Sequence, residues 1–224
     1  MGKRITEIIK YILECVLEVI YPHSNKCLCC ELDTDTESIC NRCLNNVAYI
    51  SGEYYLDKEN KVKCRSAAYY SGSIKELIIN LKYSANFESA EFLARILNKK
   101  MKDEHISGDL ITYVPISKAS SKKRGFNQCR AIGRQLSNFS GIRLINTLKR
   151  SKEVKEQKRL TIDERIENMI GVFEVSSVED IKDKKVILID DVITTGSTLM
   201  SCRDALIKAG AGEVILLTVA KSNI

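Results

Sequence analysis

The stretch that most constrains the fold is an apolar run leading directly into two adjacent carboxylates and a hydroxyl-rich loop. Residues 186–189 read Val-Ile-Leu-Ile, Asp190 and Asp191 follow, and residues 194–198 read Thr-Thr-Gly-Ser-Thr. Four branched apolar residues in a row indicate a strand buried on both faces, as in a parallel sheet. Apolar residues at roughly helical spacing come next, so we expect strand, polar loop and helix. In open α/β sheets such a loop lies at the carboxyl end of the strands, where ligands bind.

The chemistry of this loop suits a phosphorylated ribose. Backbone N–H groups and hydroxyls at an expected helix N-terminus favour an anion such as a phosphate monoester. Two carboxylates would repel a phosphate, but they can accept charge-assisted hydrogen bonds from a vicinal diol. The alternative is a strand and a capped helix that bind no ligand, but packing alone does not explain why two acids stand side by side there. We therefore predict a diol site and a phosphate site, formed by Asp190 and Asp191 and by Thr194, Thr195, Gly196, Ser197 and Thr198, respectively.

Two C-x-x-C pairs near the N-terminus predict a closed structural zinc site. The predicted ligands are Cys27, Cys30, Cys40 and Cys43. The spacing leaves Cys29 and His23 open as substitute ligands. Free or disulfide-paired thiols are the alternative, and disulfides fit poorly with a reducing cytoplasm.

The rest of the chain predicts one α/β domain with a small appendage. With 224 residues, 44% of them hydrophobic, we place the appendage at residues 1–50 and the domain at residues 51–224. Residues 5–20 predict an amphipathic helix with too many charges for a transmembrane span or a signal peptide, so we expect a cytoplasmic protein. We expect this helix to pack on the protein's own core; a membrane surface or a partner helix is the alternative. Further elements are expected as strands over 62–72 and 110–116, and helices over 74–81 and 87–97.

A one-signed charge run follows the second of these strands. From Leu110 to Lys152 the chain has ten Lys and Arg residues and no Asp or Glu, although its formal net charge is only +6. This bias favours a polyanion site over an ordinary solvated face, and both pyrophosphate and nucleic acid qualify. Phe126 and Phe139 are the only aromatic residues expected at its surface, so stacking on bases would be sparse. The residues assigned to the polyanion site are Lys118, Lys122, Lys123, Arg124 and Arg150.

The motifs together resemble those of ComF family proteins. The 190–198 stretch resembles the phosphoribosyl diphosphate (PRPP) loop of type I phosphoribosyltransferases. Val-Pro-Ile at 114–116, Lys-Arg-Gly-Phe-Asn-Gln at 123–128 and a spaced set of residues from Arg150 to Phe173 precede it in the family's order, and the cysteine knuckle leads. The resemblance covers the chain from about residue 20 to its C-terminus.

This resemblance implies a type I phosphoribosyltransferase-like fold, with a central parallel sheet flanked by helices and an N-terminal helix plus zinc ribbon. It implies a bacterial protein of competence and DNA uptake, with structural zinc and with Mg²⁺ accompanying PRPP. Family members are often labelled amidophosphoribosyltransferases. Position 2 of this chain is Gly2, however, and no glutaminase domain with an N-terminal cysteine is evident, so we do not expect a glutamine-dependent amidotransferase.

Two classes of function stay open. In the first, the chain is a phosphoribosyltransferase with an unidentified acceptor. Its basic loop at 117–124 and the segment 150–168 would neutralise the leaving pyrophosphate, while the two acids stabilise positive charge on the ribose ring. In the second, the chain is a nonenzymatic protein that works with single-stranded DNA and the competence helicase machinery. The intact loop predicts ligand binding in both, and the replacement of the usual acceptor-binding hood favours the second.

Overall fold

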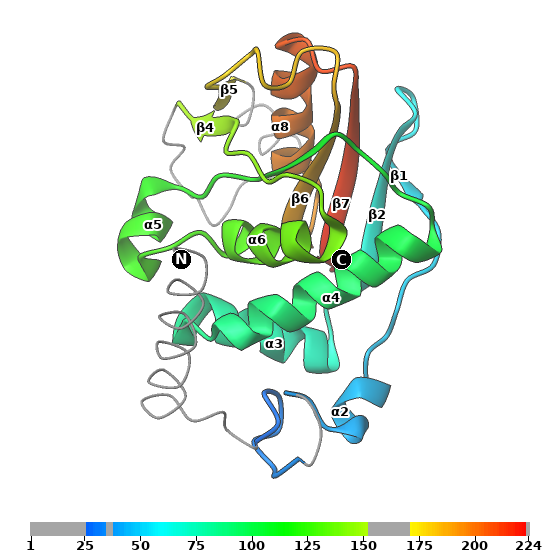
Figure 1. The fold of residues 1–224 in the computed structure, drawn as a ribbon, viewed down its shortest axis with the longest axis vertical. Helices are drawn as coiled ribbons and strands as arrows, with labels where there is room; N and C mark the ends of the chain where they lie inside the picture. The colour runs from blue at the N-terminus through cyan, green and yellow to red at the C-terminus, as the bar shows by residue number, and fades with distance from the viewer. Residues whose placement is uncertain (1–25, 35–37, 152–170, 223–224) are drawn as a thin grey trace, which may run out of the picture.

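The computed structural model describes residues 26–34, 38–151 and 171–222, and its centre is a five-stranded, mostly parallel sheet (Figure 1). The strand order is β1-β2-β7-β6-β3. Strands β2, β7, β6 and β3 run parallel, and β1 pairs antiparallel with β2 at the edge. The bounds are Tyr54–Asp57 for β1, Val62–Tyr69 for β2, Leu110–Tyr113 for β3, Lys185–Ile193 for β6 and Glu213–Lys221 for β7.

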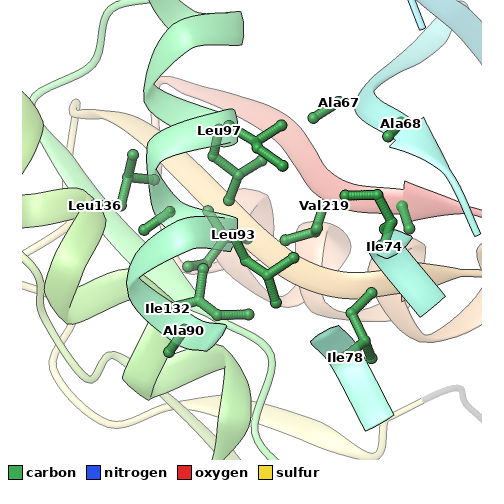
Figure 2. Close-up of a cluster of buried hydrophobic side chains, with 14 of the residues drawn as sticks. Ala67, Ala68, Ile74, Ile78, Ala90, Leu93, Leu97, Ile132, Leu136 and Val219 are labelled. Atoms are coloured by element: carbon green, nitrogen blue, oxygen red, sulfur yellow. The ribbon is translucent and has the colours of Figure 1, made fainter. Parts of the chain in front are cut away.

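Helices cover both faces of this sheet, which confirms the expected α/β class. The cluster of buried side chains on one face includes residues of α3, α4 and α6, and the cluster on the other face includes residues of α8. Figure 2 shows Leu93 of α4, Ile132 of α6 and Ile78 of α3 gathered near Val219 of β7. Because β6 and β7 are covered on both sides, their central residues are almost all apolar. The helices span Gly72–Ser84 (α3), Phe87–Asp103 (α4), Gln128–Ser140 (α6) and Ser197–Lys208 (α8).

Strand β6 continues through the acid pair, which the sequence had placed in a loop. Its pairing with β7 extends from Lys185 to Ile193, because β7, which was not predicted, is equally long. Its pairing with β3 stops at Ile189. Asp190 and Asp191 therefore lie within a strand but beyond the end of the neighbouring strand, where the sheet is open on one side.

The basic segment 117–124 is a helix and not the expected loop. Helix α5 spans Lys118–Arg124. The Ser117 side chain caps it by accepting a hydrogen bond from the N–H of Ser120 at 3.1 Å, and Gly125 ends it in a left-handed conformation. Serine before a helix and glycine after it are the ordinary signals of its two ends. The correction concentrates the cations of this segment on one short helix.

Two of the expected strands are shorter than predicted. The strand expected over 110–116 ends at Tyr113, ahead of Pro115, because proline cannot donate to a ladder. The strand expected over 62–72 ends at Tyr69, and α3 begins at Gly72. Gly72 has a φ of +47°, and a Cβ there would lie 3.0 Å from the backbone oxygen of Asn46, so this tight connection requires glycine.

A small cysteine-containing module, residues 26–34 and 38–47 with helix α2 (Asn41–Asn45), packs against α3. The Ser73 hydroxyl donates to the carbonyl of Cys43 at 2.7 Å, and the Asn80 amide donates to the carbonyl of Leu28 at 2.7 Å. Cys27 and Cys43 belong to the same buried cluster as α3 and α4. The module is thus continuous with the core of the sheet domain.

The remaining described elements form a second, two-stranded sheet of β4 (Leu148–Arg150) and β5 (Phe173–Val175), near α8. The helix expected over residues 5–20, His23 and residues 152–168 lie outside the described part of the chain. Among the described helices, none combines the length and the apolar character that crossing a membrane requires.

Candidate functional site

The loop between β6 and α8 presents backbone N–H groups and hydroxyls at a helix N-terminus. Gly196 is the N-cap residue of α8, with a φ of +80°, and no described side chain caps the helix there. The Thr195 and Ser197 hydroxyls lie 2.9 Å apart, and Thr194 is exposed. The Ser197 N–H makes a long hydrogen bond of 3.5 Å to the Thr195 hydroxyl. N–H groups of a helix's first turn favour an anion, and the phosphate site at Thr194 through Thr198 stays a prediction.

Gly196 is required by both conformation and packing. Its positive φ strains any residue with a side chain. A Cβ there would also lie 3.3 Å from the Leu56 side chain, which places strand β1 against the loop. A side chain at this position would therefore change the shape of the anion site.

The two acids have different surroundings although they are neighbours in sequence. Asp190 is partly buried, and its Oδ1 accepts hydrogen bonds from the Asp191 N–H at 2.8 Å and from the Cys129 thiol of α6 at 3.3 Å. Asp191 is only 5% exposed, and its Oδ2 forms an ion pair with the Lys82 ammonium of α3. One acid is thus the more accessible to a ligand, and the other is held by a buried cation.

The pKa values of Asp190, Lys82 and Cys129 are shifted by burial and by the charges of their neighbours. Burial, reinforced by the adjacent Asp191 charge, raises the pKa of Asp190 to about 8. Burial lowers the pKa of Lys82, but the attraction of Asp191 outweighs it and leaves that pKa above its usual value. Burial and the two carboxylates raise the pKa of Cys129 well above its usual range. Cys129 is therefore a protonated donor at neutral pH and not a nucleophilic thiolate.

Lys82 and Cys129 were not among the predicted site residues. Lys82 follows Ile74 and Ile78 at intervals of four, so a lysine on the apolar face of a predicted helix was an available signal. Cys129 carried no local signal, because only the packing of α6 against β6 brings it to the acids. The thiol and the two carboxylates lie close enough to hold a metal ion, but the Lys82 ammonium already balances Asp191, and we assign no metal there.

The cations predicted to bind a polyanion are only partly brought together. Lys118, Lys122, Lys123 and Arg124 share α5, and the first three are exposed. Arg150 lies on β4, where its guanidinium stands 5.8 Å from the Phe173 ring centroid.

Aromatic side chains from other elements join α5. The Tyr83 ring from the end of α3 lies below the Lys123 ammonium at 5.9 Å and the Arg124 guanidinium at 5.5 Å. Phe87, at the start of α4, packs against Phe126 with ring centroids 5.1 Å apart. Tyr83 and Phe87 are among the most exposed large side chains described, at 64% and 54%. We call Tyr83, Phe87, Lys123, Arg124 and Phe126 the α5 patch. The prediction of sparse aromatic residues had considered only residues 110–152, and Tyr83 and Phe87 lie outside that stretch.

Four cysteines of the N-terminal module converge as their spacing predicted. The sulfurs of Cys27, Cys30, Cys40 and Cys43 all lie within 4.8 Å of one another. The Cys30 and Cys40 sulfurs are 3.7 Å apart, far longer than a disulfide. Thiolates bound tetrahedrally at about 2.3 Å from zinc would lie about 3.8 Å apart. The donor set and its spacing therefore fit a four-coordinate metal.

Backbone hydrogen bonds favour the thiolate form of Cys27. The Cys40 N–H donates to the Cys27 sulfur at 3.3 Å. Burial raises the pKa of Cys27, but the N–H groups of Cys40, Cys29 and Cys30 outweigh it and lower that pKa to about 6. Burial raises the pKa of both Cys29 and Cys43, but of these two it is the Cys29 thiol that donates to the Ser73 carbonyl, at 3.7 Å. The structure thus favours Cys27, Cys30, Cys40 and Cys43 over a register that uses Cys29.

Comparison with known proteins agrees with this fold and this loop. The family model of the phosphoribosyl transferase domain matches residues 123–224, which include α6, β6, α8 and β7. Adenine phosphoribosyltransferase from Leishmania tarentolae is 16% identical, with 63% of this chain and 74% of that chain covered. The TM-score between the two chains is 0.41. The chain has a type I phosphoribosyltransferase-like fold: a mostly parallel sheet flanked by helices, with the cysteine cluster as an appendage.

Proteins of similar sequence indicate more closely which group of proteins this chain resembles. Competence protein F of Haemophilus influenzae is 28% identical over 206 residues, covering 88% of this chain and 90% of the relative. Competence protein ComFC of Streptococcus pneumoniae is 24% identical, covering 86% of each chain. DNA utilization protein YhgH of Escherichia coli is 27% identical, covering 66% of this chain and 67% of the relative. The chain is therefore similar to competence proteins of the ComF group, and it carries a phosphoribosyl transferase domain match over residues 123–224.

Proposed function

We propose that the chain binds PRPP or another 5-phosphorylated ribose between the N-terminus of α8 and the acid pair of β6. The observation that carries this proposal is the side-by-side placement of an anion site and a carboxylate pair at the open end of a parallel sheet. The phosphate would accept hydrogen bonds from N–H groups and hydroxyls of residues 194–198. The ribose hydroxyls would donate to the carboxylates, chiefly to Asp190, which is the more accessible of the two.

The same arrangement suits transfer of the phosphoribosyl group to an acceptor that stays unidentified. Asp190 and Asp191 would favour positive charge on the ring as the bond at C1 breaks. The cations of α5 and Arg150 would balance the charge of the departing pyrophosphate. Mg²⁺, which prefers oxygen ligands and keeps several waters, would arrive with the diphosphate and neutralise part of its charge. No side-chain nucleophile is needed, in keeping with the protonated Cys129.

For the cysteine cluster we propose a structural zinc ion. All four ligands come from the protein, so the site is closed and offers no position for a substrate. Its contribution would be the folding of the module that α3 carries.

The second candidate function is single-stranded nucleic acid binding, and the α5 patch favours it. Exposed aromatic rings next to cations are the elements that bind single strands, since every base can stack and every phosphate is charged. Relatives named as competence and DNA utilization proteins support a role in DNA uptake. The partners would then be single-stranded DNA and the competence helicase machinery, which places the protein in the cytoplasm.

A thermal-shift screen separates the two candidates. PRPP, ribose 5-phosphate, inorganic phosphate and a short oligodeoxythymidine would each be tested with and without Mg²⁺. Binding to the folded state raises the melting temperature, so a shift with PRPP and ribose 5-phosphate supports the ribose site. A shift with the oligonucleotide that is lost in Tyr83→Ala supports the α5 patch. If no phosphorylated ribose shifts the transition, the first proposal is wrong.

A further inference from the structure

A partly buried lysine from outside the matched domain, Lys82, contacts the acid pair. Lys82 lies near the C-terminal end of α3, and its side chain is 18% exposed. It continues the row of Ile74 and Ile78, which Figure 2 shows on the buried side of α3. A charged group in that row would be costly without a partner, and the partner is Asp191.

The positive charge of Lys82 can offset the repulsion between the two acids. Two adjacent carboxylates repel, and a pair left alone in a buried site tends to share one proton. A shared proton would leave only one carboxylate charge for two ribose hydroxyls. A cation in contact with the more buried acid offsets part of this repulsion, and Asp190 then ionises above its raised pKa of about 8.

Helix α3 is well placed to hold that cation still. Ser73 and Asn80 tie the helix to the cysteine module by the hydrogen bonds described above, and its apolar face is buried against the sheet. The Asp190 charge also affects the pKa of three thiols, those of Cys129, Cys64 and Cys202. Burial raises the pKa of each of these thiols, so they stay neutral and add no further negative charge beside the acids.

We propose that Lys82 is a positioning residue of the ribose site. Its ammonium holds the Asp191 side chain beside Asp190, so that both acids are in position to accept hydrogen bonds from the sugar. The inference rests on the proposed ribose function and adds a residue to it from outside residues 123–224. It also makes the ribose site depend on α3, the helix that carries the cysteine module.

The test compares Lys82→Met, Lys82→Arg and the control Lys75→Met, which changes an exposed lysine on the same helix. Calorimetry measures affinity for ribose 5-phosphate and for inorganic phosphate from about pH 6 to about pH 9. At the upper end, Lys82→Met should bind ribose 5-phosphate about ten- to a hundredfold more weakly, the equivalent of one charge-assisted hydrogen bond. Its affinity for phosphate should be unchanged. Lys82→Arg should restore ribose binding, and Lys75→Met should behave as the unmodified protein.

Carbon-13 NMR of the aspartate carboxyl groups gives a readout that needs no ligand. The Asp191 carboxyl signal should have the same position in the unmodified protein and in Lys82→Arg. In Lys82→Met that signal should shift, because the contact with the ammonium is lost. If Lys82→Met folds poorly, Lys82→Met with Asp191→Asn removes both charges and should unfold at a higher temperature than Lys82→Met alone, because no buried charge is left unpaired.

The outcomes distinguish this inference from the proposed function. If the unmodified protein binds ribose 5-phosphate and Lys82→Met keeps the same preference for it over phosphate at every pH, the role of Lys82 is wrong and the ribose site stands. If the unmodified protein binds no ribose 5-phosphate, the proposed function is wrong, and the role of Lys82 in ribose binding is rejected with it.

Discussion

The Cys129 thiol donates to Oδ1 of Asp190 across 3.3 Å, and this contact joins α6 to the most accessible acid of the candidate site. It stabilises the ionised form of Asp190, yet burial and the Asp191 charge prevail and raise the pKa of Asp190 from 3.8 to about 8. An acid with a raised pKa binds its proton more tightly in the folded state than in the unfolded state. Its contribution to stability is therefore full below pH 3.8 and is lost as the pH rises through about 8.

The first prediction follows from the raised pKa of Asp190 and the resulting pH dependence of stability. The free energy of unfolding of the unmodified protein should contain a component that falls as the pH rises between those two values, and Asp190→Asn should lack it. Denaturant unfolding followed by far-UV circular dichroism measures this, since the chain has no Trp for fluorescence. The control is Asp204→Asn, on the exposed side of α8. Identical pH profiles for Asp190→Asn and the unmodified protein would show that the pKa of Asp190 is ordinary.

The second prediction concerns the metal. We expect one zinc ion per chain, lost in Cys40→Ser and retained in Cys29→Ser, because the Cys29 thiol points to the Ser73 carbonyl. Elemental analysis of metal-replete protein measures the content. Metal loss should unfold the cysteine module, since zinc binding there is coupled to folding, while the sheet domain keeps its circular dichroism. Zinc-free unmodified protein, or equal loss in the two variants, contradicts the assignment.

The third prediction concerns salt and the α5 patch. Affinity for a single-stranded oligonucleotide should fall steeply with ionic strength, because lysine and arginine side chains that bind the phosphates displace the counterions held there. Lys122→Glu with Lys123→Glu should weaken binding whatever the base sequence and reduce the salt slope. Lys102→Glu with Lys208→Glu, which makes the same charge change on exposed positions of α4 and α8, should do much less. Equal effects of the two pairs would indicate net charge alone, and affinity independent of salt would exclude this surface.

The fourth prediction compares two glycines that share a left-handed conformation. Gly196 and Gly141 have φ values of +80° and +74°, but only at Gly196 would a Cβ meet another side chain. Each glycine-to-valine change should cost about 1–3 kcal/mol of stability through backbone strain. Only Gly196→Val should abolish phosphate binding, because it changes the shape of the anion site. Phosphate titrations by calorimetry test this, and equal binding by the two variants would place the phosphate elsewhere.

Local patterns were enough to predict the strand of residues 186–189, the helices α3 and α4 and the four-cysteine cluster. Each is encoded within a short stretch, by apolar periodicity or by ligand spacing. The fold class followed from the order of those stretches. Strand β7 was missed, although its run of apolar residues resembles that of β6.

The contacts that shape the site could not be predicted in the same way. Lys82 precedes Asp191 by more than a hundred residues, and Tyr83 meets Lys123 only because α3 ends beside α5. Contacts of this kind are set by the packing of whole helices on the sheet. The sequence identified the acids as a pair, but the raised pKa of Asp190 depends on the helices that bury it.

The measurement that tests the ribose site most directly is calorimetry of ribose 5-phosphate and inorganic phosphate with the unmodified protein, Asp190→Asn and Asp191→Asn, at a pH above about 8, where Asp190 is ionised. The unmodified protein should prefer ribose 5-phosphate. Both variants should keep their affinity for phosphate and lose that preference, at about 1.5–3 kcal/mol for each charge-assisted hydrogen bond removed, or roughly ten- to a hundredfold in affinity. If both variants bind the two ligands as the unmodified protein does, the carboxylates do not hold the diol, and the kinship with phosphoribosyltransferases is one of fold alone.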